Sequence, residues 1–223
     1  MKFVLSSYEV VRPMIQANVE ENEITVDSFW EAHVLESNHY VIVDGADVVG
    51  YASIHKAKTM TGFYLKESHL QYGKELFEQL KRYEQVTNAM VPTGDEVFLS
   101  HCVDNFARME KQAFFSIYRE QAPVGFQRIP LHYERVTCAA DVELLKLAGD
   151  FFTDEPVDKL FDEGFHYRIY TVYHGEELVG FGVVETGRVL RGIASIGMYV
   201  MEEKRQMGYA KNILRQLCEM MSK

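Results

Sequence analysis

Cysteine is scarce in this chain of 223 residues, and its three copies, Cys102, Cys138 and Cys218, stand far apart without a Cys-x-x-Cys pair. An odd and sparse set of thiols excludes the disulfide framework of a small secreted domain and indicates reduced thiols in a cytosolic protein. His101 and His132 have no partner at the spacing of a metal site. We therefore expect neither disulfides nor a bound metal.

The chain also lacks long apolar runs and an excess of positive charge. No stretch approaches the ~18 apolar residues that cross a membrane, and the N-terminus has no signal-peptide core or cleavage site. We expect a soluble, cytoplasmic protein. The formal net charge of -10 argues against nucleic acid or a membrane as partner, because each needs a basic surface. This acidity suits a cationic substrate such as an amine, although it also serves simply to keep a protein in solution.

What the chain does contain is an internal repeat. Residues 40–54 read YVIVDGADVVGYASI, and residues 170–184 read YTVYHGEELVGFGVV. In each segment two alternating apolar runs flank a short turn with glycine, which predicts a β-hairpin. Identical residues stand at four matching places: Tyr40 and Tyr170, Gly45 and Gly175, Val49 and Val179, Gly50 and Gly180.

A strand and then a helix are predicted after each hairpin, at 61–65 and 73–83 in the first half and at 195–200 and 208–221 in the second. Both helices carry apolar residues at i, i+3 and i+4. The duplicated order indicates an α+β fold of two mixed-sheet units, the second incomplete at its C-terminus.

Further elements are expected around the repeats. We predict helices at 25–35 and 141–152, and in the first half a strand at 96–101, a helix at 104–115 and closing strands at 117–119 and 125–129. We place the domain boundary at residue 130, which gives domains 1–130 and 131–223.

The densest chemical signal lies between the last strand and the last helix. Gly208 and Ala210 are small enough for a ligand to approach the backbone closely. The first N–H groups of a helix have no partner within it and point out of its positive end. Arg205 and Lys211 add positive charge. The loop therefore predicts a site for phosphate or pyrophosphate. The alternative interpretation is a helix start whose small residues only permit close packing.

Residues 205–210, RQMGYA, resemble the Q/R-x-x-G-x-G/A motif of the GNAT acetyltransferase superfamily. The resemblance implies acetyl-CoA as co-substrate, with its pyrophosphate on the backbone N–H groups of 206–211. It also implies that the backbone of 198–200 pairs with the pantetheine arm. The coenzyme-binding residues so implied are Met198, Tyr199, Val200, Arg205, Gln206, Met207, Gly208, Tyr209, Ala210 and Lys211.

The same loop in the first half departs from the motif. Ser68 stands in place of the basic residue and Gln71 in place of the first glycine. Gln71 thus carries a side chain where phosphate oxygens need to reach the backbone. Lys111 stands where many family members place a tyrosine that acts as general acid. The first half is expected to be a degenerate GNAT-like domain with a structural role.

Acetyl transfer to an amine needs a neutral nitrogen, which for a lysine-like group of pKa near 10.4 costs roughly 4–5 kcal/mol at pH 7. A carboxylate or histidine acting as base would assist. Glu185, at the end of the second hairpin, is the first candidate for a catalytic role, and a solvated edge charge is the alternative. His166 and Glu163, just before that hairpin, are weaker candidates.

Family members continue past the last helix with a strand, a helix and closing strands, and none follows Lys223. Either the chain is truncated, or the first half supplies the missing wall, or coenzyme binding is weak or lost. We predict an acyl-CoA-dependent N-acetyltransferase acting on a small-molecule or protein amine, with a homodimer left open. The alternatives are a non-catalytic GNAT-like module that binds a ligand or partner, and an aminoacyl-transferring relative. The last would require a charged tRNA, which the acidic chain disfavours.

Overall fold

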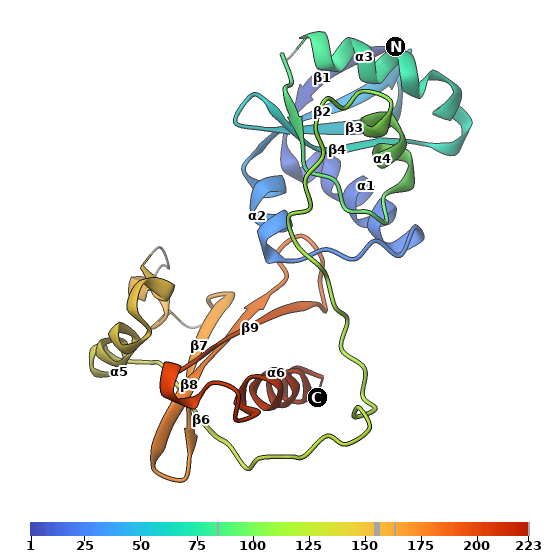
Figure 1. Cartoon of the computed structure of the whole chain (residues 1–223). Helices are drawn as coiled ribbons and strands as arrows, with labels where there is room; N and C mark the ends of the chain where they lie inside the picture. Colours follow the sequence, from blue (N-terminus) through green and yellow to red (C-terminus); the bar gives the residue numbers. More distant parts are fainter. Residues whose placement is uncertain (84, 154–156, 163, 223) are drawn as a thin grey trace. The chain divides into compact units, whose positions relative to one another are not determined.

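A computed structural model describes residues 1–83, 85–153, 157–162 and 164–222 of the chain (Figure 1). The chain divides into two compact units, Met1–Phe115 and Ser116–Lys223. This division falls before residue 130, where we expected the domain boundary. Within the described ranges, no helix is both long enough and apolar enough to cross a membrane.

The first unit is built on a five-stranded sheet in the order β1-β2-β3-β4-β5. Its strands are β1 Lys2–Ser6, β2 Ser37–Asp44, β3 Asp47–His55, β4 Thr59–Leu65 and β5 Asn88–Ala89. The first four are antiparallel, and β5 runs parallel to the beginning of β4. The hairpin and strand predicted for the first half are confirmed as β2, β3 and β4.

Helices cover both faces of this sheet. On one face, α3 (Gly73–Tyr83) and α4 (Glu96–Val103) enclose an apolar core with alternate residues of β2, such as Tyr40 and Ile42. On the other face, α1 (Tyr8–Glu21) lies against β2 and β3, and α2 (Ser28–Leu35) lies against β3 and β4. Because side chains alternate along a strand, Ser37 and His39 point to this second face. This second face buries polar side chains such as His39 and Ser53 as well as apolar ones from α1 and α2.

Four predictions for the end of the first half are wrong. Residues 96–101 form part of α4 instead of a strand, because Asp95 caps the helix by accepting a hydrogen bond from the N–H of Phe98 at 3.1 Å. The helix expected at 104–115 is absent there, since α4 already ends at Val103, where Asn105 donates to the carbonyl of His101 at 2.9 Å. The strands expected at 117–119 and 125–129 are irregular chain.

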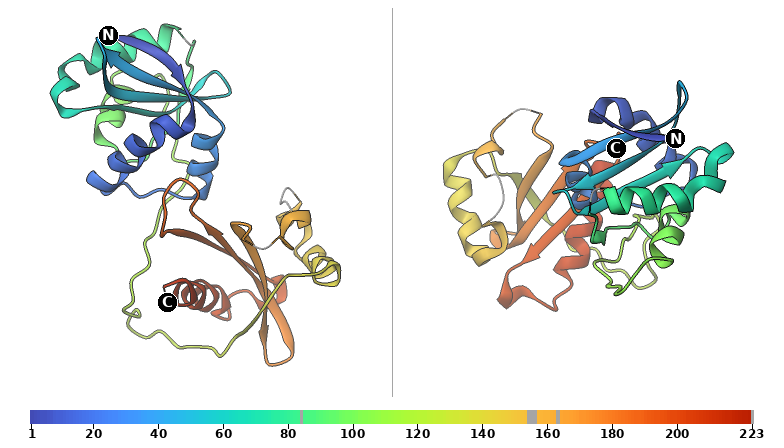
Figure 2. Two further views of the ribbon diagram at one scale, coloured as in Figure 1. Left: turned by 180° about the vertical axis from the view of Figure 1, so that it is seen from behind. Right: turned by 90° about the horizontal axis from the view of Figure 1, so that it is seen from above.

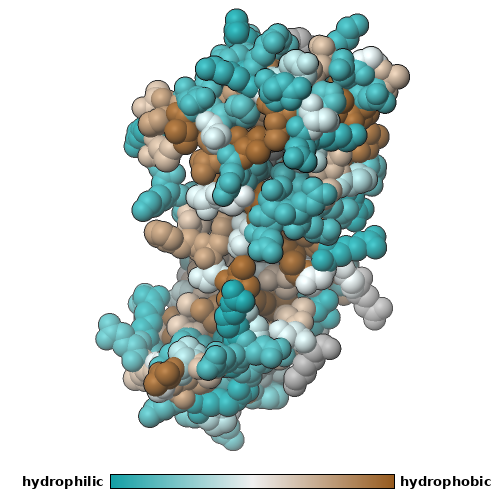
Figure 3. All heavy atoms as spheres, turned by 90° about the vertical axis from the view of Figure 1, so that its right-hand side faces the viewer, coloured by the Kyte–Doolittle hydropathy of each residue, from teal (hydrophilic) through white to brown (hydrophobic). Residues whose placement is uncertain are grey.

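Residues 104–131 are also rich in exposed apolar side chains. Phe114, Ile117 and Val124 are among the most exposed large apolar residues of the chain. Elsewhere apolar side chains are exposed singly or in small groups, as on the mainly hydrophilic face of Figure 3. Such scattered exposure is ordinary for a protein surface.

The second unit is built on a four-stranded antiparallel sheet in the order β6-β7-β8-β9. Its strands are β6 His132–Arg135, β7 Tyr167–His174, β8 Glu177–Thr186 and β9 Ala194–Val200. Helix α6 (Tyr209–Met221) packs on one face, and α5 (Ala139–Leu145) with the 3-10 helix η2 (Lys146–Phe152) packs on the other (Figure 1 and Figure 2). The second hairpin, strand and helix are confirmed.

The duplication extends to irregularities of the sheet. A register shift falls between Ile42 and Val43 in the first hairpin and between Val172 and Tyr173 in the second. A shared β-bulge is a stronger sign of common architecture than shared residues alone. The two units differ at the outer edge: β4 pairs with β5, whereas β9 has only β8 as neighbour in the described part of the chain.

Candidate functional site

The loop between β9 and α6 has a left-handed backbone at two positions. After the short 3-10 helix η4 (Glu202–Lys204), Gln206 has φ 64° and Gly208 has φ 88° with ψ 0°. Gly208 is the N-cap of α6, and the helix begins at Tyr209. Glycine adopts such a conformation without steric cost. The backbone therefore requires the glycine that the sequence motif singled out.

The leading amides of α6 are available to a ligand. The N–H of Arg205 donates to the carbonyl of Glu202 at 3.2 Å, and the N–H of Asn212 donates to the carbonyl of Gly208 at 3.3 Å. The N–H groups of residues 208–211, which lie between these two positions, donate no hydrogen bond among the described residues. The N-cap residue is Gly208, so no N-cap side chain accepts from them either. Four donors at the positive end of a helix form a site suited to an anion.

Two cations flank these donors. The Arg205 side chain folds back along β9, with its Nε 3.4 Å from the carbonyl of Val200 and its guanidinium 5.8 Å from the centre of the Tyr199 ring. It also lies 3.5 Å from a carboxylate oxygen of Glu202, on the exposed surface. The ammonium of Lys211 is exposed and lies 6.0 Å from the centre of the Phe126 ring. Both side chains are exposed enough to turn toward a phosphate.

Strand β9 brings an open backbone edge to the same place. Tyr199 points to the face covered by η2, where its ring lies 5.2 Å from that of Phe151. Met198 and Val200 point to the face covered by α6. A cavity of about 620 Å³ lies on the Tyr199 side, lined also by Arg205, by acidic residues of η4 and by η2.

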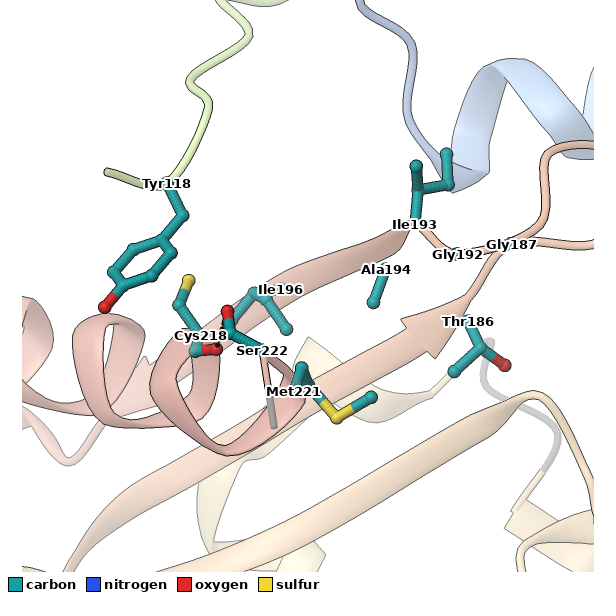
Figure 4. Close-up of a pocket in the computed structure, with 10 residues that line it drawn as sticks. All are labelled: Tyr118, Thr186, Gly187, Gly192, Ile193, Ala194, Ile196, Cys218, Met221 and Ser222. Carbon is teal, nitrogen blue, oxygen red and sulfur yellow. Dashed lines mark hydrogen bonds between the residues drawn. The ribbon is translucent and has the colours of Figure 1, made fainter. Parts of the chain in front are cut away.

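A second cavity, of about 370 Å³, lies beside the first half of β9. Figure 4 shows Ala194 and Ile196 of β9 on one side and Cys218 and Met221, from the end of α6, on the other. In the first unit, β5 occupies the corresponding edge of β4 by pairing with Thr59 and Met60. The cavity thus lies where the first unit has one more strand.

Glu185 and His166 lie close together at the open end of the β7–β8 hairpin, opposite its turn. His166 Nε2 lies 3.5 Å from Glu185 Oε1, and Arg188 Nη2 lies 3.6 Å from the same oxygen. Arg188 was not singled out from the sequence, although it stands three residues after Glu185. Glu163, the third candidate base, lies outside the described residues. The carboxylate of Glu185 is therefore placed between two nitrogen groups and is largely buried.

The matching loop of the first unit has a different backbone. The 3-10 helix η1 (Glu67–Tyr72) runs directly into α3, and the N–H of Gly73 donates to the carbonyl of Leu70. The side chain of Gln71 folds back onto the carbonyl of Ser68 at 3.1 Å. A Cβ at Gly73 would lie 2.6 Å from His101 Nε2, so this glycine makes room for a side chain of the same unit. The left-handed glycine of the second loop has no counterpart between 67 and 73.

Sequence reasoning also missed Asn212, which is fully buried on α6. Its side chain accepts from the N–H of Ile129 at 2.9 Å and donates to the carbonyls of Gln127 and Gly208, each at 3.1 Å. The signal in the sequence was a pair of amides, Asn212 and Gln216, at i and i+4 on the buried side of the helix. The irregular chain before β6 thus belongs to the second unit and reaches the loop of the site.

Comparison with known proteins identifies the family of both units. Residues 7–119 match the family described as "Acetyltransferase (GNAT) domain", and residues 142–223 match "Acetyltransferase (GNAT) family". Among solved structures, an acetyltransferase from the GNAT family from Colwellia psychrerythraea is 16% identical, covers 100% of this chain and 86% of its own, and has a TM-score of 0.72, a likeness of fold. None of the curated proteins matches the chain. The chain belongs to the GNAT acetyltransferase family, and it carries two GNAT units in tandem.

Proposed function

We propose that this protein is an acyl-CoA-dependent N-acetyltransferase that binds acetyl-CoA in its second unit. The observation that carries the proposal is the set of four N–H groups at 208–211, which have no partner among the described residues and stand at the positive end of α6. Oriented amides of this kind bind phosphate oxygens without the cost of rearranging the backbone. Arg205 and Lys211 would add charge to the pyrophosphate contact.

The edge of β9 supports the same assignment. An exposed strand edge offers unpaired N–H and C=O groups to any extended chain that lies beside it. Pantetheine is such a chain, because it contains two amide groups. With the pyrophosphate at 208–211, the arm would lie along Met198, Tyr199 and Val200 and carry the thioester toward the middle of β9.

Glu185 is the residue we assign as general base. A carboxylate can take the proton of an ammonium acceptor directly or through one water. His166, beside the carboxylate, would stabilise its charge or pass on the proton. The neutral amine then attacks the thioester carbonyl, the tetrahedral intermediate collapses with cleavage of the C–S bond, and the coenzyme thiolate leaves and takes up the proton that the amide nitrogen loses. The amine that serves as acceptor, a small molecule or a protein side chain, is the open part of the proposal.

A second candidate, a non-catalytic GNAT-like module that binds a ligand or partner, has one specific observation in its favour. The carboxylate of Glu185 already has His166 and Arg188 within 3.6 Å. A carboxylate that already makes two such contacts is also typical of an ion cluster with a purely structural role.

Thermal unfolding with acetyl-CoA tests whether the protein binds the coenzyme, and an assay of thiol release then separates the two candidates. Ligand at 100 times its Kd stabilises the folded state by about 2.7 kcal/mol, so we expect a clear rise of Tm in the parent protein. Gly208→Glu should abolish the rise, because it strains a left-handed residue and puts a carboxylate where phosphate would bind. Gln71→Glu, the matched change in the first unit, should leave it intact.

Calorimetry should give one acetyl-CoA per chain. If millimolar acetyl-CoA leaves the Tm of the parent unchanged, the enzyme proposal fails and the binding module is favoured. A rise of Tm without release of free thiol from any amine in a broad panel would favour the binding module as well.

A further inference from the structure

We infer that Asn212 is a positioning residue for acetyl-CoA, because it fastens the chain segment before β6 to the glycine that opens α6. The inference rests on the proposed function, since it concerns the same coenzyme loop. We call residues 118–129 the strap. Neither the family motif nor any of the expected site residues includes Asn212 or the strap.

The strap is held along α6 by side chains of the helix. Asn212 and Gln216 both form hydrogen bonds with Ile129. The N–H of Ile129 donates to the Asn212 side chain at 2.9 Å, and its carbonyl accepts from the Gln216 side chain at 2.8 Å. Arg215 donates to the carbonyl of Glu120 and lies 5.5 Å from the centre of the Phe126 ring. Side chains of the helix thus satisfy backbone groups that an irregular segment cannot satisfy by itself.

Asn212 differs from Gln216 because it also holds Gly208. The carbonyl of Gly208 accepts from the Asn212 side chain at 3.1 Å and from its backbone N–H at 3.3 Å. The Cδ1 atom of Ile129 lies 3.8 Å from the place that a Cβ of Gly208 would occupy. The strap and Asn212 therefore fix Gly208 from its carbonyl side, while its N–H side stays open to a ligand.

This support matters because donors bind an anion best when they are already oriented. A loop that must rearrange on binding gives up part of its binding free energy to ordering. Gly208 controls the geometry of the loop, since its left-handed backbone conformation sets the direction in which the N–H groups of 209–211 point. A residue that fixes the conformation of Gly208 without touching the ligand affects affinity through preorganisation of the donors.

The test compares two full-length variants that loosen the same strap. Asn212→Leu removes the side-chain hydrogen bonds to Ile129, Gln127 and Gly208 and leaves only the backbone bond of residue 212 to Gly208. Gln216→Leu removes the bond to the carbonyl of Ile129 and a 3.5 Å bond to Asn212, and leaves the side-chain bond of Asn212 to Gly208 in place. We expect Asn212→Leu to raise the Kd for acetyl-CoA, measured by calorimetry, by roughly tenfold, as the loss of one buried hydrogen bond would. Gln216→Leu should change it less than twofold. Asn212→Asp, which keeps the acceptor for Ile129 and loses the donor to Gly208 and to Gln127, should behave like Asn212→Leu and serves if the leucine variant does not fold.

Equal weakening by the Asn212 and Gln216 variants, or none by either, would overturn the inference while acetyl-CoA binding by the parent stood. If the parent itself does not bind acetyl-CoA, the proposed function fails, and hydrogen exchange without ligand decides the positioning role separately. The amide at position 212 donates to Gly208. Its exchange should be faster in Asn212→Asp than in Gln216→Leu, and equal rates would remove the claim that Asn212 holds Gly208.

Discussion

Gly50 and Gly180 occupy the same place in the two units, and a Cβ added to either would lie 2.2 Å from a carbonyl oxygen of the neighbouring strand. That oxygen belongs to Tyr64 in the first unit and to Tyr199 in the second. Because the obstacle is backbone, it cannot turn aside as a flexible side chain would. The two glycines are therefore a matched pair of probes, one in each copy of the fold.

Gly180→Ala should destabilise the second unit by about 1–3 kcal/mol, the usual range for overpacking a closed structure. The added methyl group presses on β9 at Tyr199, so acetyl-CoA binding should weaken as well. Gly50→Ala should cost the first unit a similar amount and leave the Kd unchanged. Urea unfolding and calorimetry measure the two effects. A Gly50 variant that weakened coenzyme binding as strongly would contradict the assignment to the second unit.

Replacing Glu185 by glutamine tests the proposed base. Loss of a general base typically lowers kcat by about 10²–10⁴-fold. The KM for acetyl-CoA should stay the same, because Glu185 lies at the end of β8 away from 208–211. Thiol release with a reactive amine is the measurement. Arg188→Gln is the control, since it removes the other neighbour of the carboxylate and leaves the carboxylate itself. If kcat is unchanged in Glu185→Gln, the glutamate is structural.

The first unit should lose stability in mild acid. Burial lowers the pKa of His39, whose Nδ1 lies 2.8 Å from Ser53 Oγ, and burial lowers the pKa of His101 as well. An unfolded histidine binds its proton near pH 6.5, above the folded pKa. The unfolded chain thus holds more protons between these values, and stability falls as pH drops below about 6.5.

Trp30 reports this effect, because it is the single tryptophan and is buried in the first unit. Its fluorescence during urea unfolding should give a lower midpoint at pH 5.5 than at pH 8. His39→Gln should show a smaller difference between the two pH values than the parent. An identical difference in parent and variant would assign the acid sensitivity to other groups.

The sequence predicted the repeated parts of this fold well and the segment between them poorly. Hairpins 40–54 and 170–184 each place two short runs rich in β-branched and aromatic residues around a turn with glycine, a pattern that favours strands. Residues 96–101 are too short for either period to appear, and the deciding group was Asp95, one residue outside the segment. The segment 104–131 has no regular structure at all, so no periodicity could describe it.

The site shows the same division between local and distant information. The conformation of Gly208 follows from its own neighbours along the chain, and a sequence motif captures it. The contact of Asn212 with Ile129 joins residues 83 positions apart. A single sequence carries no direct sign of such a pairing. The buried amides at 212 and 216 hinted only that some polar partner would be found.

The strap also has a practical consequence for anyone who wishes to excise the second unit, which we propose binds acetyl-CoA, or transplant it into another protein. A piece cut at the boundary we expected, 131–223, would discard Gln127 and Ile129 and leave Asn212 without two of its hydrogen-bond partners. Its failure to bind acetyl-CoA would then say nothing about the intact protein. A fragment that begins at Ser116 keeps the whole strap and is the safer choice.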